Sequence, residues 1–179
     1  ESENFSINSY TRIQENGNVV SHIGNMGTIS KYGIQFSGSL KLNNIITINP
    51  WFRIYNMCTS VNELAKMHNI SARHKITLET SVSVIAAFRH DIAFSLRFNY
   101  SSPVISMQSY YFSDPLWMIS AEKTFRKKFK AGIVTALPFI RSFTYQGYKT
   151  DMGSLIMHSQ GNLKLPVFPF WLKIGYQFS

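Results

Sequence analysis

The last stretch of the chain, residues 167–179, alternates between two kinds of side chain. Every second position carries a large apolar residue, and these residues are Phe168, Phe170, Leu172, Ile174, Tyr176 and Phe178. A repeat of two places them all on one face of a β-strand. A tilted strand of about 9 to 11 residues crosses a bilayer, and such alternation is typical of a transmembrane β-strand. A half-buried strand of a soluble sheet fits the same pattern.

The composition favours the membrane. Charged residues make up only 15% of the chain, and Phe, Trp and Tyr together make up another 15%. A soluble domain has about 25% charged residues, which keep its exterior dispersed in water. No run approaches the ~18 apolar residues of a transmembrane helix, which excludes a helical membrane protein. No signal peptide stands at the start, so we expect a mature or truncated chain.

Charge and chemistry exclude further classes. The net charge is +9, but the basic residues are scattered and form no nucleic-acid-binding motif, so attraction to anionic head groups or lipopolysaccharide is the better interpretation. The single cysteine, Cys58, excludes an intrachain disulfide and a zinc cluster. The nearest material for Ser–His catalysis is His158 with Ser159, and His74 with nearby serines. Adjacent strand residues point to opposite faces, so we expect no enzyme, no metal site and no cofactor.

Strand patterns recur along the whole chain. The expected strands are 4–13, 19–23, 32–42, 46–55, 75–88, 92–101, 117–125, 129–140 and 167–178. The strand 129–140 is apolar on both faces, so its phase cannot be assigned. Connections alternate between short turns (15–18, 43–44, 89–91 and 126–128) and long loops (24–30, 58–72, 102–114 and 141–165), with a short helical turn around 62–67. Short turns on one rim and long loops on the other are typical of outer-membrane barrels.

The polar residues indicate which way the apolar faces point. The polar faces carry mostly Ser, Thr, Asn, Gln and Gly, with about one charge per strand, as in a hydrated barrel lumen. Aromatic residues near strand ends match the girdles of a membrane barrel, and they are Tyr32, Tyr100, Trp117 and Tyr176. We therefore predict an all-β fold, an antiparallel up-and-down transmembrane β-barrel meander of about nine strands.

The number of strands carries a further expectation. Complete bacterial barrels normally have an even number of strands, and an odd count places the two chain ends on opposite rims. We therefore interpret residues 1–179 as the C-terminal segment of an outer-membrane β-barrel domain with no plug domain present. A miscount of one strand, at 19–23 or within 141–165, would remove this inference.

Particular residues resemble a known family. The ending 174–178 resembles the C-terminal strand of bacterial outer-membrane barrels, which commonly ends in Tyr-x-Phe, although here Ser179 follows Phe178. Segments 119–125 and 136–139, on either side of a basic turn, are similar to the closing strands of TonB-dependent receptor-like barrels of the Bacteroidetes type. So is the pair Tyr32-Gly33 after an Asn-Met-Gly loop. Leu137 departs from the pattern, since related barrels often carry a lumen-facing Asp there.

The resemblance implies a function. It covers the last two thirds of the chain and implies a barrel of about 22 strands in the bacterial outer membrane that takes up an iron chelate, a vitamin or an oligosaccharide. The implied partners are lipid and lipopolysaccharide, the remaining barrel strands and plug, TonB through the N-terminal region, and a surface lipoprotein. The substrate, the oligomeric state and the presence of a plug and TonB box upstream do not follow from these residues.

Two sets of residues are candidates for function. Charged residues expected to face the lumen are Arg12, Lys41, Arg53, Glu79, Arg97, Glu122 and Lys173. Aromatic residues of the outer loops that could stack on a ligand are Tyr110, Tyr111, Phe143, Tyr145 and Tyr148. Tyr176 and Phe178 are expected to serve barrel assembly. Pairing with water or with each other, and anchoring at the head groups, remain the alternatives for the first two sets.

Two other classes of protein stay open. One is a complete small outer-membrane barrel of eight to ten strands with a structural or adhesion role. The other is a soluble ligand-binding barrel, which would carry the same apolar side chains in its interior. The position of the Phe- and Ile-bearing faces in the folded chain distinguishes the soluble barrel from the other two.

Overall fold

We describe the protein from a computed structural model, which covers residues 3–5, 8–126, 128–152 and 155–176. The regular structure of the described chain is β-strand apart from one short α-helix and one 3-10 turn. Its elements are β1 (Glu3–Phe5), β2 (Asn8–Ile13), β3 (Val19–Gly24), β4 (Gly27–Ser37), β5 (Leu40–Lys41), β6 (Ile46–Val61), α1 (Glu63–Met67), β7 (His74–Phe88), η1 (Arg89–Asp91), β8 (Ile92–Ser101), β9 (Val104–Ile105), β10 (Ser109–Phe112), β11 (Leu116–Phe125), β12 (Phe129–Ala136), β13 (Ser142–Asp151), β14 (Ile156–Lys164) and β15 (Phe170–Tyr176).

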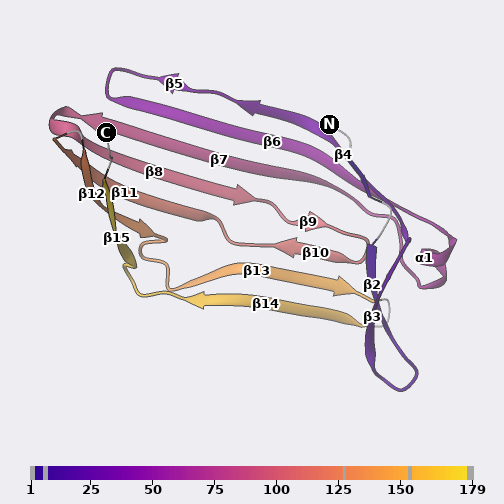
Figure 1. Cartoon of the computed structure of the whole chain (residues 1–179). Helices are drawn as coiled ribbons and strands as arrows, with labels where there is room; N and C mark the ends of the chain where they lie inside the picture. Colours follow the sequence, from indigo (N-terminus) through magenta and orange to yellow (C-terminus); the bar gives the residue numbers. More distant parts are fainter. Residues whose placement is uncertain (1–2, 6–7, 127, 153–154, 177–179) are drawn as a thin grey trace.

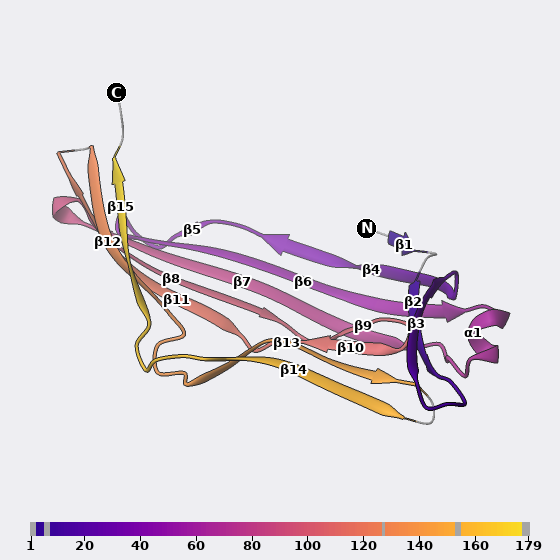
Figure 2. The same ribbon diagram turned by 60° about the horizontal axis from the view of Figure 1, so that its bottom comes forward.

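One large antiparallel sheet dominates the molecule (Figure 1). Its strands follow the order β1-β4-β6-β7-β8-β11-β12-β15, and β5 pairs with β6 at one edge. From β4 onward the order is that of an up-and-down meander, as predicted. The sheet curls, because β12 and β15 stand at a steep angle to β6 and β7 (Figure 2). Its path ends at β1 and β15, so the described part of the sheet is open and not a closed barrel.

The short connections of this sheet lie together at one rim, where β15 also ends (Figure 1). The side chain of Asn43 holds the first of them, since its Oδ1 accepts hydrogen bonds from the backbone of Ile45 and Ile46 at 2.8 and 2.6 Å. His90 and Arg126 adopt positive φ in the other two, as tight turns require. The turns predicted at 43–44 and 89–91 are therefore confirmed. Of the turn predicted at 126–128, residue 127 lies outside the described residues, and β11 ends at Phe125 and β12 begins at Phe129 on either side of it.

The N-terminal strands differ from the prediction. β2 and β3 form a hairpin around Gly17, within the short turn predicted at 15–18, but they make a two-stranded sheet of their own. They do not belong to the meander, and their turn is not on the short-turn rim. The predicted loop 24–30 is also wrong, because β4 begins at Gly27. There Gly27 has a φ of +137°, and a Cβ would collide with the carbonyl of Ser60.

The long connections contain more regular structure than the sequence indicated. β6 runs on through part of the predicted loop 58–72, and the helical turn expected at 62–67 is α1, capped by Asn62. The predicted excursion 141–165 is the hairpin β13–β14. This hairpin joins β10 and β9 in a four-stranded sheet at the long-loop end. The register also assigns the phase of β12, with Phe129, Ala131, Ile133 and Thr135 on the face of Ile119.

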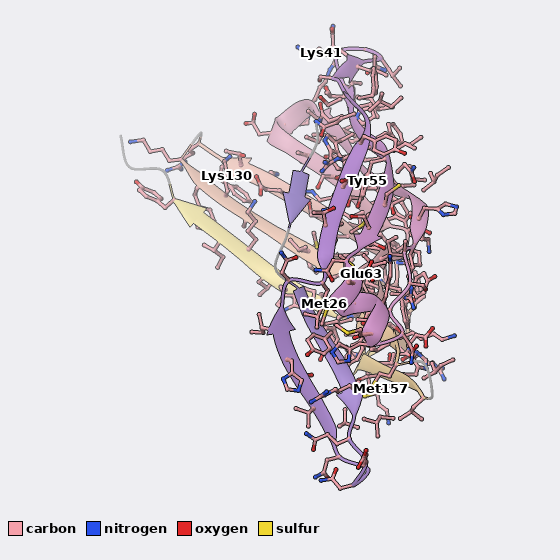
Figure 3. All side chains as sticks on the ribbon, turned by 90° about the vertical axis from the view of Figure 1, so that its right-hand side faces the viewer. Met26, Lys41, Tyr55, Glu63, Lys130 and Met157 are labelled. Carbon is pink, nitrogen blue, oxygen red and sulfur yellow. The ribbon has the colours of Figure 1, made fainter. Side chains whose placement is uncertain are left out.

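The buried core is small and lies at the long-loop end of the molecule. It joins one face of the large sheet to the β2–β3 hairpin, α1 and the β9–β10 connection, and its members are Met26, Ile29, Tyr55, Met57, Ala65, Ile70, Ile105 and Met107. Figure 3 views the molecule from this end and shows Met26 close to Glu63 of α1. Tyr55 fits into this core because its partner in the register is Gly33, where a Cβ would collide with the Ile54 carbonyl.

Candidate functional site

The large sheet has two chemically different faces, which follow from the strand register. The apolar face carries the alternate residues that include Ile34, Ile54 and Leu172. The polar face carries the residues between them, including Arg53 and Tyr55. The core described above covers only the polar face.

The apolar face is exposed in the described chain. Its rings and aliphatic side chains form continuous cross-strand rows, such as Phe36–Phe52 and Ile34–Ile54. Ile34, Leu172 and Ile174 have 77%, 75% and 72% of their surface exposed. On the described residues of strands β4 to β15 of this sheet, Lys123 is the only Asp, Glu, Lys or Arg on that face. The prediction that these rings are not packed in a soluble core is confirmed.

Such a surface is larger and more apolar than water-soluble proteins expose. Aromatic side chains mark its borders, as in the girdles of membrane barrels. Tyr100 and Trp117 lie at the long-loop ends of β8 and β11, and Tyr176 lies at the short-turn end of β15, opposite Phe129. Tyr32 differs from the prediction, since it lies in the middle of β4. Phe178 lies outside the described residues.

The polar face collects most of the predicted lumen charges. The register places six of the seven there, namely Lys41, Arg53, Glu79, Arg97, Glu122 and Lys173. Arg12 lies elsewhere, in β2 opposite Val20, and so is not in the wall with the others. The difference follows from strand pairing, because among the described residues β2 pairs only with β3 and so stands outside the wall.

Two small networks order the charges on the polar face. Lys173 Nζ lies 2.7 Å from Glu122 Oε2, and Lys130 Nζ lies 3.9 Å from Glu122 Oε1. The Tyr55 hydroxyl donates a hydrogen bond to Glu79 Oε1 at 2.8 Å. The guanidinium of Arg53 lies 5.0 Å from the centre of the Tyr55 ring, at cation–π distance. Both carboxylates predicted for this face are therefore held by neighbouring side chains.

The five loop aromatics do not form one site. Tyr111 and Tyr148 are register partners with ring centres 6.4 Å apart. Tyr110 points to the other face of β10, with Arg73 and Lys75 at 5.2 and 5.3 Å from its ring centre.

Of the remaining two, Tyr145 is exposed and its ring occupies the space above Gly161, where a Cβ would meet it. Phe143 is only 8% exposed, so most of its ring is covered by its neighbours. Phe143 and Tyr145 nevertheless line a groove of about 490 Å³ with Trp51, Glu79 and Asp114.

The structure adds contacts that the sequence did not indicate, and these bind the long-loop segments to one another. The amide of Gln108 forms two hydrogen bonds with the backbone of Thr11, at 2.8 and 3.1 Å. Arg73 Nη2 lies 3.2 Å from Asp151 Oδ2, which attaches the tip of β13 to the sheet. The Tyr10 ring stacks between the rings of His22 and His68. Sequence separations of up to 97 residues explain why no local pattern predicted them.

The structure also places the residues considered for catalysis and the one that departs from the family pattern. His158 and Ser159 are consecutive in β14, and Ser159 is the register partner of Tyr148. Leu137 is buried just beyond the end of β12, with a φ of +50°. Among the described residues, no group of three His, Cys, Asp or Glu side chains could hold a metal ion. No helix in the described ranges has the length and apolar character to cross a membrane.

An exposed apolar face, aromatic borders and a polar opposite face together define a wall segment of a transmembrane β-barrel. The family comparison agrees: the model of the outer membrane protein beta-barrel family matches residues 1–136. The chain belongs to that family, and its location is the bacterial outer membrane. No curated protein and no solved structure matches the chain.

Proposed function

We propose that the chain forms part of the wall of a larger outer-membrane barrel. The supporting observation is the open sheet, because within the described ranges β15 pairs only with β12 and the path at the other side ends at β1. A strand edge in hydrocarbon leaves backbone N–H and C=O groups without partners, at a cost of several kcal/mol for each group. Further strands of the same wall would satisfy these groups, and the resemblance puts the complete barrel at about 22 strands.

We further propose that this barrel is a TonB-dependent receptor that takes up a scarce nutrient, an iron chelate, a vitamin or an oligosaccharide. The polar face would line the lumen, against a plug contributed by another part of the protein. The segments at the long-loop end, with Tyr110 and Tyr145 exposed, would meet the ligand outside the cell. Lipopolysaccharide and a surface lipoprotein would be neighbours at that rim, and TonB would act from the periplasm. The proposal involves no catalysis and no cofactor.

The test uses the complete gene product in its own outer membrane. Deleting the gene should abolish growth on one limiting nutrient among iron chelates, vitamins and oligosaccharides. Restoring the gene should restore growth, and collapsing the proton motive force should stop the uptake, because TonB coupling depends on it.

A different outcome would support the alternative. A gene product of about this size that closes into a barrel alone in detergent, and whose deletion leaves uptake of every nutrient unchanged, would remove the transport proposal. It would instead favour a small barrel with a structural or adhesion role.

A further inference from the structure

The polar face of the large sheet carries unequal numbers of positive and negative charges. On β5, β6, β7, β8, β11, β12 and β15 it holds two carboxylates, Glu79 and Glu122. The same strands hold six cations on that face, which are Lys41, Lys75, Arg53, Arg97, Lys130 and Lys173. The apolar face of these strands has only Lys123, so the positive excess lies on the side that the proposed function places in the lumen.

The two carboxylates do not neutralise this excess. Glu122 is in contact with both Lys173 and Lys130. Glu79 accepts a hydrogen bond from the Tyr55 hydroxyl and is the register partner of Arg53.

Three cations of this face remain without a carboxylate. Arg97 lies opposite Ser83 and Met118, and neither it nor Lys41 has an ion-pair partner among the described residues. Lys75 rests against the Tyr110 ring. These three cations are available to a ligand.

The cations are spread along the strands from rim to rim. The position of each cation along the sheet can be given by the β7 residue in the same cross-strand row. Lys75 belongs to β7 itself, and Arg53 is the register partner of Glu79. Arg97 is the register partner of Ser83. Lys41 pairs with Thr47, which in turn pairs with Ile85, so Lys41 lies in the row of Ile85. The first two steps, of four residues each, correspond to about 13 Å, and the last, of two residues, corresponds to about 7 Å. Such spacing matches an extended solute with several anionic groups better than a single compact anion.

We infer that the polar face forms a cationic track that selects polyanionic solutes, such as oligosaccharides or chelates carrying several carboxylate, sulfate or phosphate groups. The inference rests on the proposed function, since it requires this face to line the lumen. Rings of Arg and Lys make pores selective for anions, and charged clefts raise the local concentration of oppositely charged ligands. The track begins beside Tyr110 at the long-loop end and reaches Lys173 near the short-turn rim.

The experiment measures binding of a short, fluorescent dextran sulfate oligomer to the full-length gene product in detergent. Unsulfated dextran of the same length is the neutral control probe. Lys41→Gln combined with Arg97→Gln removes two charges from the track, and both side chains are exposed, so the fold should tolerate the change. The matched control combines Lys66→Gln in α1 with Lys123→Gln on the apolar face, which removes the same net charge elsewhere.

We expect the sulfated oligomer to bind and the neutral dextran not to bind. Each track substitution should weaken binding about fivefold, as expected for roughly one unit charge near an anionic ligand. The effect should shrink as salt rises, because exposed charges are screened. The Lys66 and Lys123 double variant should bind like the unmodified protein.

Equal binding of the two dextrans, or equal weakening by the track and control variants, would overturn the inference. Nutrient uptake that depends on the gene but does not change in the track double variant would also overturn it, while leaving the transport proposal intact. Loss of the transport proposal has a different signature, since deletion of the gene would then leave uptake unchanged.

Discussion

The orientation of the sheet in the bilayer can be tested with one pair of neighbouring substitutions. Leu96 lies in the middle of β8 on the apolar face, between Val84 and Ile119, and is 42% exposed. Ser95 is its neighbour on the polar face, where its hydroxyl lies 2.7 Å from that of Ser120. The variants are Leu96→Arg and Ser95→Arg in the full-length protein.

The position of Leu96 determines the expected magnitude. It lies about four residues from each end of β8, which is roughly 13 Å along a strand and about 9 Å in depth at a tilt of ~45°. That places it near the middle of an apolar band about 25 Å tall, where an arginine costs about 2–4 kcal/mol. Leu96→Arg should therefore lower the folding equilibrium constant by about 30- to 900-fold. Ser95→Arg meets water and loses one hydrogen bond, which costs about 0.5–1.5 kcal/mol.

The assay is equilibrium folding into lipid vesicles from urea, with the folded fraction measured by the heat-dependent mobility shift on gels. Leu96→Arg should move the urea midpoint far below that of the unmodified protein, and Ser95→Arg should move it only slightly. The opposite order, with the larger loss at Ser95, would mean that the polar face meets lipid and would refute the assignment of the two faces.

Three further predictions concern packing at the long-loop end. Gly33→Val should lower the free energy of unfolding by about 1–3 kcal/mol, because the new side chain collides with the strand that carries Tyr55; the urea midpoint measures this. Gln108→Ala should release the β2–β3 hairpin and speed proteolysis at 13–19, since two hydrogen bonds worth about 0.5–1.5 kcal/mol each are lost; an unchanged cleavage rate contradicts this. Arg73→Ala should destabilise the β13 tip by about 1.5–3 kcal/mol, seen as faster amide hydrogen exchange near Asp151 and unchanged exchange in β7.

The face of each wall strand could be predicted from sequence because a repeat of two is a local property. Phe52, Ile54 and Leu172 all lie where their alternation placed them. The faces of β12 could not be assigned in this way, since residues on both of its faces, such as Ile133 and Val134, are apolar. Only pairing with β11 and β15 places Ile133 on the apolar face.

The candidate functional residues also fall into two groups, those that local alternation placed correctly and those whose surroundings depend on distant parts of the chain. Arg53, Glu79 and Glu122 were placed on the polar face by alternation alone. Phe143 could not be recognised as buried, because its surroundings come from β8 and β11 as well as its own hairpin. Arg12 was assigned to the wall because nothing local distinguishes a wall strand from a hairpin that folds beyond the rim.

The sequence by itself determined most strands of the large sheet, the short turns between them and the side of the sheet that repels water. Each of these depends on residues only a few positions apart, such as Asn43 with its two neighbours. The tertiary structure alone decided which segments build the wall and which pack at its end. Those choices depend on contacts such as Gln108 with Thr11 and Arg73 with Asp151, which join residues 97 and 78 positions apart. Their stability comes from the whole arrangement of strands, which no short stretch of the chain encodes.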